Sequence, residues 1–324
     1  MEATESGDPS EKLAEFQEYF QRDLEKGFTA DVACCDRCFS DFVQLWPRLQ
    51  RGPGINFERT AIDLTSFYSN SYLRDVYTEA QFYHHVSQLC CPRCLRPFGG
   101  SIWPYELPFN VPPNFEDVLE EVSRLARRTP FLLLQNPFCS SLLAAIADAA
   151  RASETTEILA PLFRARATAD GLVDRELGAF DFPPARCAKE GRYNHAGCPV
   201  LYLGSDVETC HAELRGAPCL AIEFRLLVAI KILDLTDPFV SHEKQADLLN
   251  TVVWSAMLSA KQEDIGAYNP HYIFSRFVAD CARAAGFHAI RYPSTRVEGF
   301  NLVIVDGIHT LKGAAEVLAY HERP

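Results

Sequence analysis

The sequence has few of the features that mark nucleic-acid-binding or membrane proteins. Its 31 lysines and arginines are outnumbered by 43 aspartates and glutamates, which gives a formal net charge of -12. This balance disfavours attraction to phosphate backbones or anionic lipids, so we expect neither nucleic acid nor a membrane among the partners. The longest apolar stretch, from Phe131 to Ala150, is interrupted by polar residues and a proline. It is therefore not expected to form a lipid-spanning helix.

A secretory leader is also not expected, because the first residues are acidic and polar where a leader is basic and then apolar. We therefore expect a cytoplasmic protein. Reducing conditions in the cytoplasm keep thiols free, so the 12 cysteines are not expected to form a disulfide framework. With 48% hydrophobic and 23% charged residues, the composition is that of a folded globular protein.

The length of 324 residues predicts two domains, or one domain with a sizeable appendage. Four prolines between Pro104 and Pro113 disfavour regular structure and indicate a boundary near residue 110. Apolar residues then recur at helical spacing. The expected organisation is an N-terminal domain at 1–110, a helical connector at 111–160 and a C-terminal domain at 161–324.

The C-terminal half alternates short apolar runs with helical patterns. Runs rich in Val, Ile, Leu and aromatics predict strands at 199–204, 219–228, 230–235, 287–293 and 301–305. Helices are expected at about 206–215, 243–260 and 272–285, the first with Ser205 and Glu208 as a capping box, and the last residues, 315–324, as a short helical end. The pattern predicts a mixed α+β fold on a mainly antiparallel β-sheet with flanking helices.

Two pairs of cysteines share a spacing suited to metal binding. Cys35 and Cys38 form one CxxC motif, and Cys91 and Cys94 form the other. Each motif can direct two thiolates at one ion, and two motifs complete the tetrahedron that structural Zn²⁺ prefers. The sequence therefore predicts a small zinc-binding domain, with buried free thiols as the alternative interpretation.

The ligand set of this zinc site has open alternatives. Cys34 and Cys90 each precede a CxxC motif and could replace its first ligand, while His84 or His85 could substitute on the second side. The long segment between the two motifs is expected to contain a helical hairpin that includes the aromatic residues around Phe82.

Several common catalytic motifs are absent, including the P-loop, the GxGxxG fingerprint, HExxH and GxSxG. What the C-terminal half contains is an ordered series of polar residues within apolar strands. The series consists of Arg164 in LFRAR, Arg192 in GRYNHAG, Tyr202 in PVLYLGS, Glu213 in ETCHAEL and Ser294 in RYPSTR.

This series resembles the RES domain, named for its Arg, Glu and Ser, over roughly residues 161–305. The CxxCF pattern that begins at Cys35 resembles a zinc-knuckle domain found ahead of some RES domains. The resemblance implies an ADP-ribosyltransferase-like fold and NAD⁺ as the substrate, cleaved by hydrolysis or phosphorolysis. It also implies a toxin of a toxin-antitoxin pair, with an antitoxin or sensor protein as partner.

The resemblance assigns Arg164, Glu213 and Ser294 to catalysis and Arg164, Arg192 and Tyr202 to NAD⁺ binding. Guanidinium groups grip phosphate oxygens, and a carboxylate favours the positive charge that develops on the ribose when the nicotinamide bond breaks. Ser294 is expected to bind substrate and not to act as a nucleophile. Each of these residues also has an ordinary structural interpretation, and Arg166 is interpreted as a bystander.

The sequence departs from the family pattern at Tyr193, where Met or Trp is common, and at Gly204, where alanine is common. Two alternative functions remain open. One is a mono-ADP-ribosyltransferase that modifies a protein or small-molecule acceptor, and the other is a non-catalytic zinc-knuckle interaction protein.

Overall fold

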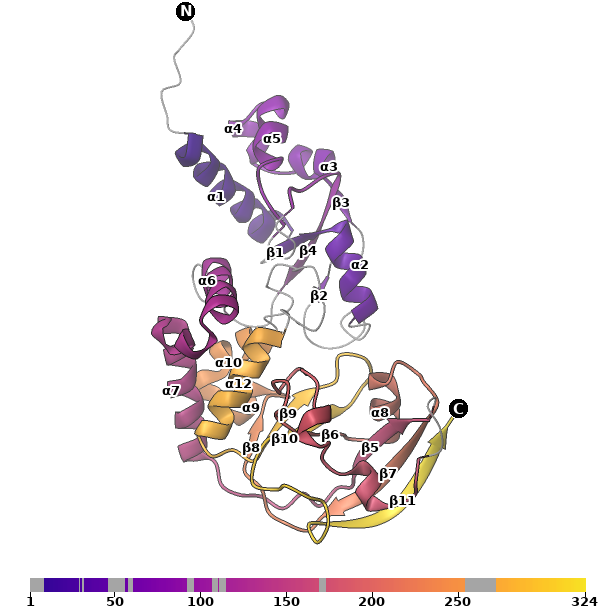
Figure 1. The fold of residues 1–324 in the computed structure, drawn as a ribbon. Helices are drawn as coiled ribbons and strands as arrows, with labels where there is room; N and C mark the ends of the chain where they lie inside the picture. The colour runs from indigo at the N-terminus through magenta and orange to yellow at the C-terminus, as the bar shows by residue number, and fades with distance from the viewer. Residues whose placement is uncertain are drawn as a thin grey trace, which may run out of the picture. The chain divides into compact units, whose positions relative to one another are not determined.

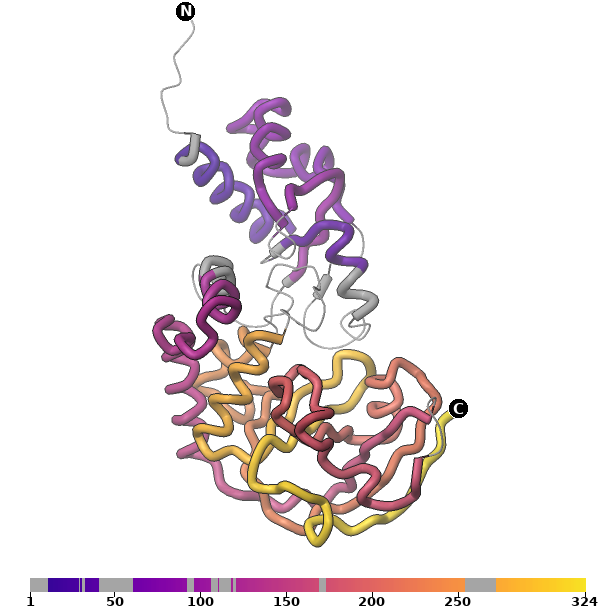
Figure 2. Tube along the Cα trace, viewed as in Figure 1, coloured from indigo at the N-terminus to yellow at the C-terminus, as the bar shows by residue number. Residues whose placement is uncertain are grey.

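The computed structural model describes residues 9–28, 30, 32–45, 56–57, 61–91, 96–106, 110, 115–168, 173–253 and 272–324. These residues fall into two compact units, one before Phe109 and one after it. Figures 1 and 2 trace both units along the chain from indigo to yellow. Each unit is described separately below.

The N-terminal unit is built on the short strand β4, Ser101–Glu106. This strand pairs antiparallel with β1 (Val32–Cys35), β2 (Asn56–Phe57) and β3 (Ile62–Asp63). The helices are α1 (Pro9–Gly27), α2 (Asp36–Leu45), α3 (Leu64–Ser69), α4 (Leu73–Val76) and α5 (Glu79–Val86). Fully buried aromatic side chains, among them Phe16, Phe67 and Phe82, form the core. The predicted helical hairpin between the CxxC motifs is therefore three short helices, α3 to α5.

The C-terminal unit begins with α6 (Phe115–Arg128), the 3-10 helix η2 (Pro130–Gln135) and α7 (Pro137–Ala152). Asn136 caps α7, because its side-chain oxygen accepts hydrogen bonds from the backbone N–H groups of Phe138 at 3.0 Å and Cys139 at 3.4 Å. The polar interruption of the apolar run is thus the start of a helix. No helix among the described residues is long and apolar enough to cross a membrane.

The centre of this unit is a seven-stranded sheet with the order β11-β7-β5-β6-β10-β9-β8. Its strands are β5 (Leu162–Ala167), β6 (Leu201–Gly204), β7 (Cys219–Leu226), β8 (Ile232–Asp234), β9 (Ala289–Pro293), β10 (Phe300–Ile304) and β11 (Ala315–Arg323). Every neighbouring pair is antiparallel except β8 and β9, which are parallel. The predicted α+β fold with a mainly antiparallel sheet is confirmed.

The other helices that the structure describes in this unit are α8 (Val207–Glu213), α9 (Pro238–Ser241), α10 (Ala246–Val253) and α12 (Ile273–Ala284), with 3-10 turns η3 (Leu177–Phe180), η4 (Ala185–Cys187) and η5 (Glu243–Gln245). Beyond α10, the predicted helix at 243–260 lies outside the described residues. Helix α12 packs against α7.

Two local predictions are wrong. The N-cap of α8 is Asp206 and not Ser205, because the Asp206 carboxylate accepts a hydrogen bond from the backbone N–H of Thr209 at 2.6 Å. The last residues form strand β11 and not a helix. This strand pairs antiparallel with β7 and is bulged between Val317 and Ala319. The backbone groups along the edge of β7 need partners, and pairing with them outweighs the weak local preference of this segment.

Candidate functional site

Glu213 is held at the end of α8 by side chains from two other parts of the sheet. Its Oε1 accepts hydrogen bonds from Asn301 Nδ2 at 2.9 Å and from Ser294 Oγ at 3.4 Å. Its Oε2 lies 3.7 Å from Arg296 Nε, and 41% of the Glu213 side chain is exposed. The carboxylate is therefore fixed on one side and accessible to a ligand on the other.

Ser294 follows the last residue of β9 and is only 2% exposed. Its backbone N–H donates to Gly299 O at 3.1 Å, and its Oγ accepts from the backbone N–H groups of Arg296 at 3.3 Å and Val297 at 3.5 Å. The hydroxyl thus organises this turn and directs its proton at Glu213. This geometry suits a positioning and hydrogen-bonding group.

Asn301 and Arg296 were not identified from the sequence as site residues. Asn301 is 6% exposed on β10, and it is the polar residue in the otherwise apolar run NLVIV. A buried amide within such a run needs a hydrogen-bond partner, which is a signal that the sequence does contain. Arg296 lies two residues after Ser294, and its distance from Glu213 depends on how the turn folds.

The GRYN segment forms a tight turn that Tyr202 holds in place. The Tyr202 hydroxyl on β6 accepts a hydrogen bond from the backbone N–H of Tyr193 at 2.8 Å and donates to Asn194 Oδ1 at 3.0 Å. Burial raises the pKa of Tyr202, so the hydroxyl stays protonated. A Cβ at Gly191 would lie 2.4 Å from Asn194 Oδ1 and 2.8 Å from the Tyr202 hydroxyl oxygen, so a larger residue would displace the side chains that hold the turn.

Arg192 is positioned by this turn above two aromatic rings. Its guanidinium carbon lies 5.0 Å from the ring centroid of Tyr292 and 5.8 Å from that of Tyr193. Burial disfavours the charge, but the electrostatic effects of Tyr193, Tyr292 and other neighbours, including Glu213, outweigh it and raise the pKa of Arg192. A permanent cation therefore lies within electrostatic reach of the Glu213 carboxylate.

Arg164 lies on β5 where that strand separates from β6. The two strands pair only through Phe163 and Gly204. Beyond this pair, Arg164 Nη1 donates to the backbone carbonyl of Tyr202 at 3.2 Å. Burial, together with the charge of Arg166, lowers the pKa of Arg164 to about 10, so the guanidinium remains charged at neutral pH.

The predicted residues fall into two groups of contacts. Glu213 and Ser294 touch directly, whereas Arg164 and Arg192 are each connected to Tyr202, the first through its carbonyl and the second through the turn that its hydroxyl holds. The described contacts include no direct one between Arg164 and Glu213. The assignment of these five residues to a single catalytic site stays a prediction.

Both departures from the family pattern have packing reasons. A Cβ at Gly204 would lie 2.8 Å from Cys210 Sγ, so the thiol of α8 occupies the space that alanine would need. Tyr193 is 1% exposed, and its ring centroid lies 4.6 Å from that of Tyr292. It is thus a core residue beneath Arg192.

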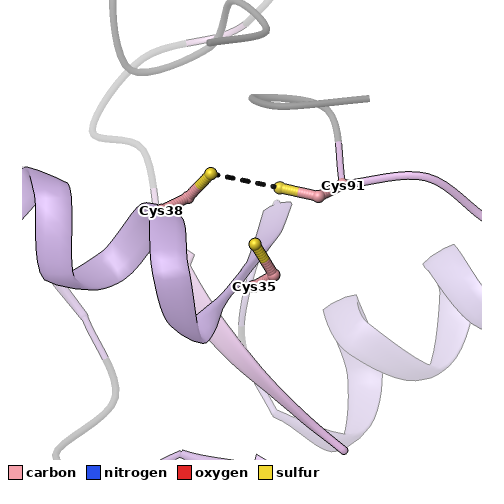
Figure 3. A group of neighbouring side chains, drawn as sticks. All are labelled: Cys35, Cys38 and Cys91. Carbon is pink, nitrogen blue, oxygen red and sulfur yellow. Dashed lines mark hydrogen bonds between the residues drawn. The ribbon is translucent and has the colours of Figure 1, made fainter. Parts of the chain in front are cut away.

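In the N-terminal unit, Cys35, Cys38 and Cys91 point toward one another (Figure 3). Their sulfur atoms all lie within 4.8 Å of one another, and those of Cys38 and Cys91 are 3.8 Å apart. Tetrahedral Zn²⁺ with Zn–S bonds of about 2.3 Å places its sulfur ligands about 3.8 Å apart. The three thiols therefore fit a zinc ion. Cys94 lies outside the described residues.

The neighbouring cysteines and histidines are placed differently. Cys34 is fully buried and adjacent to Cys35 on β1, so its side chain points to the opposite face of the strand. Cys90 is exposed. The His85 ring stacks on Phe16, with the ring centroids 5.1 Å apart. None of these residues, nor His84, belongs to the thiol group found in the described part of the chain.

A carboxylate holds the first CxxC turn against the sheet. Asp36 accepts hydrogen bonds from Trp103 Nε1 and from Ser101 Oγ, both at 2.8 Å. Because Asp36 lies between Cys35 and Cys38, these bonds to β4 fix the turn that carries both thiols.

The fold and the polar residues define an α+β domain built on a mainly antiparallel sheet, with an arginine on β5, a glutamate at the end of α8 and a serine directly after β9. A family model described as the RES domain matches residues 161–323, half of the chain. The chain therefore belongs to the RES domain family. One solved structure that it resembles is the M. tuberculosis MbcT-MbcA toxin-antitoxin complex, at 15% identity and a TM-score of 0.35, with 55% of this chain and 91% of that chain covered. No curated protein matches the chain.

Proposed function

We propose that this chain is an NAD⁺-consuming enzyme that cleaves the bond between nicotinamide and ribose by hydrolysis or phosphorolysis. The observation that carries the proposal is the Glu213 carboxylate. It is partly exposed, it is fixed by Asn301 and Ser294, and it lies near the cation of Arg192. The family relationship supplies NAD⁺ as the substrate.

The proposed chemistry requires little movement of protons. The carbon-nitrogen bond breaks with its electron pair going to the nicotinamide nitrogen, so neutral nicotinamide leaves and positive charge develops on the ribose. Glu213 favours that charge, because a carboxylate in a fixed position needs no reorganisation as the charge forms. In hydrolysis, water then bonds to the ribose carbon and releases one proton to solvent, which yields ADP-ribose. In phosphorolysis, a phosphate oxygen bonds to the same carbon and yields the phosphate ester of ADP-ribose.

The products of NAD⁺ incubation test this function. The purified chain is incubated with NAD⁺, with and without phosphate, and the mixture is followed by NMR and mass spectrometry. Free ADP-ribose indicates hydrolysis, an ADP-ribose phosphate that forms only with phosphate indicates phosphorolysis, and modified protein indicates transfer. Unchanged NAD⁺ in every mixture, from protein shown to be folded, would refute the proposal.

We also propose a structural role for the N-terminal unit. Cys35, Cys38 and Cys91 would hold one Zn²⁺, with Cys94 as the fourth ligand, and the ion would link α2 to the second CxxC motif. In small zinc domains, the free energy of zinc binding contributes directly to the stability of the fold. The chain would then consist of a zinc-binding domain at 1–110, a helical connector at 111–160 and the catalytic RES domain at 161–324.

We propose that a cytoplasmic enzyme of this kind is restrained by an antitoxin or sensor protein, or by its own zinc-binding domain. Destruction of NAD⁺ in the producing cell would otherwise be harmful. Expression of residues 111–324, with folding checked by circular dichroism, separates the two routes. Greater toxicity than that of the full chain implicates the zinc-binding domain, and equal toxicity implicates a separate protein.

A further inference from the structure

Two arginines lie on the same face of β5. Arg164 and Arg166 are separated by one residue, and side chains at such positions in a strand share a face. Their partners across the strand pair with β7 are Ile222 and Leu220, which belong to the apolar core of this unit. Two cations thus project side by side from a strand whose neighbours on this face are apolar.

Neither cation is neutralised by an acidic partner among the described residues. The Nε atoms of Arg164 and Arg166 are both buried and have no hydrogen-bond acceptor. Neither side chain forms an ion pair with another described residue. Among the described residues, the two guanidinium groups together form one hydrogen bond, which Arg164 donates to the Tyr202 carbonyl.

Two acidic residues that could pair with these arginines have other partners. The Asp181 carboxylate, which acts on Arg164 electrostatically, bonds to the Thr310 hydroxyl at 2.6 Å and to the Leu311 backbone N–H at 2.9 Å. On β11, Glu322 lies in register with Leu220 and thus on the face of Arg166, but it pairs with Arg175. Neither carboxylate therefore forms an ion pair with Arg164 or Arg166.

Arg164 and Arg166 are both partly buried, and two adjacent like charges in such a setting repel each other unless a ligand of opposite charge joins them. We propose that Arg164 and Arg166 together form a binding site for the diphosphate group of the substrate, so that Arg166 is a second diphosphate ligand. This inference rests on the proposed function for the identity of the substrate. Each guanidinium can present a pair of N–H donors to one phosphate, and the spacing along the strand suits a ligand with two linked phosphates.

Binding of ADP-ribose by isothermal calorimetry tests the site without any turnover. The substitution Arg166→Met keeps an apolar side chain of similar length and removes the charge. We expect affinity for ADP-ribose to fall by about tenfold or more, and the salt dependence of binding to weaken. The matched control is Arg225→Met, which removes a half-exposed arginine of β7 paired with Glu316. It should leave ADP-ribose affinity unchanged.

Thermal unfolding separates a ligand-binding arginine from a structural one. Without ligand, Arg166→Met should raise the melting temperature or leave it unchanged, because it removes uncompensated repulsion. Excess inorganic pyrophosphate should stabilise the wild type and should stabilise the Arg166→Met variant less. A lower melting temperature without ligand, together with unchanged ADP-ribose affinity, would show that Arg166 has a structural role and overturn the inference.

These results are distinguishable from failure of the proposed function. If the wild type bound ADP-ribose through Arg166 but never consumed NAD⁺, the diphosphate site would stand and the enzymatic function would fall. If the wild type consumed NAD⁺ and Arg166→Met bound ADP-ribose equally well, the function would stand and the diphosphate site would fall.

Discussion

The side-chain amide of Asn301 donates the shorter of the two hydrogen bonds to the Glu213 carboxylate, at 2.9 Å compared with 3.4 Å from Ser294. The first distance lies in the normal range for N–H donors, and the second is longer than is usual for a hydroxyl donor. Asn301 is also almost fully buried, so water cannot easily replace it. We therefore expect Asn301 to be the main positioning residue for Glu213.

The size of the effect follows from the energy of this bond. A hydrogen bond to a charged group contributes about 1.5–3 kcal/mol, and roughly 1.4 kcal/mol corresponds to a tenfold change in rate. Asn301→Ala should thus lower kcat/KM for NAD⁺ by about 10- to 100-fold. The loss should appear mainly in kcat, because Glu213 acts on charge that forms only in the transition state.

The assay is steady-state release of nicotinamide, measured by chromatography on protein whose folding is verified by circular dichroism. Asn250→Ala is the control, because Asn250 is a buried asparagine on α10 without a described contact to Glu213. It should destabilise the fold without a comparable loss of kcat. An Asn301→Ala variant whose kcat/KM stays within about threefold of the wild type would refute this positioning role.

Two further predictions concern the cysteines. Freshly purified protein should contain about one equivalent of zinc by elemental analysis; Cys38→Ser should lose it, whereas Cys90→Ser, which changes an exposed thiol outside the cluster, should retain it. Zinc below about a tenth of an equivalent in the wild type would contradict the metal site. Burial raises the pKa of Cys139, Cys210 and Cys281 to about 12. These thiols should therefore resist iodoacetamide in the folded protein at pH 8, while Cys90 reacts. The folded protein keeps these thiol protons at a pH at which the unfolded chain releases them. The contribution of the three thiols to the free energy of unfolding is therefore fully present below about pH 8.5 and is lost as the pH rises toward the folded pKa. Rapid labelling of all three under native conditions, detected by mass spectrometry, would contradict their burial.

Much of the sheet could be predicted because its strands are short apolar runs between turn residues. The runs at 219–228 and 287–293 correspond to β7 and β9, and that at 301–305 corresponds to β10. The last strand, β11, could not be recognised in the same way, since its residues gain order by pairing with β7 and have no clear alternation of their own. Its position depends on a partner nearly a hundred residues away in the sequence.

The candidate site shows a similar division. The ordered polar residues led to Glu213 and Ser294, which the structure brings into contact. Local sequence did not reveal Asn301, because its partner lies on α8, far away in the sequence. From the sequence, Arg166 is interpreted as a bystander, because Arg164 is the residue that matches the family position. Only strand pairing shows that Arg164 and Arg166 share an apolar face.

The most direct test of the central claim is a comparison of NAD⁺ turnover and NAD⁺ binding in Glu213→Gln. The change removes the carboxylate charge and keeps the size of the side chain. We expect kcat to fall below detection while the dissociation constant for NAD⁺ stays within a few fold of the wild type, because the charge acts mainly in the transition state. Arg164→Ala should instead weaken NAD⁺ binding. Turnover by Glu213→Gln at the wild-type rate with saturating NAD⁺ would contradict the account.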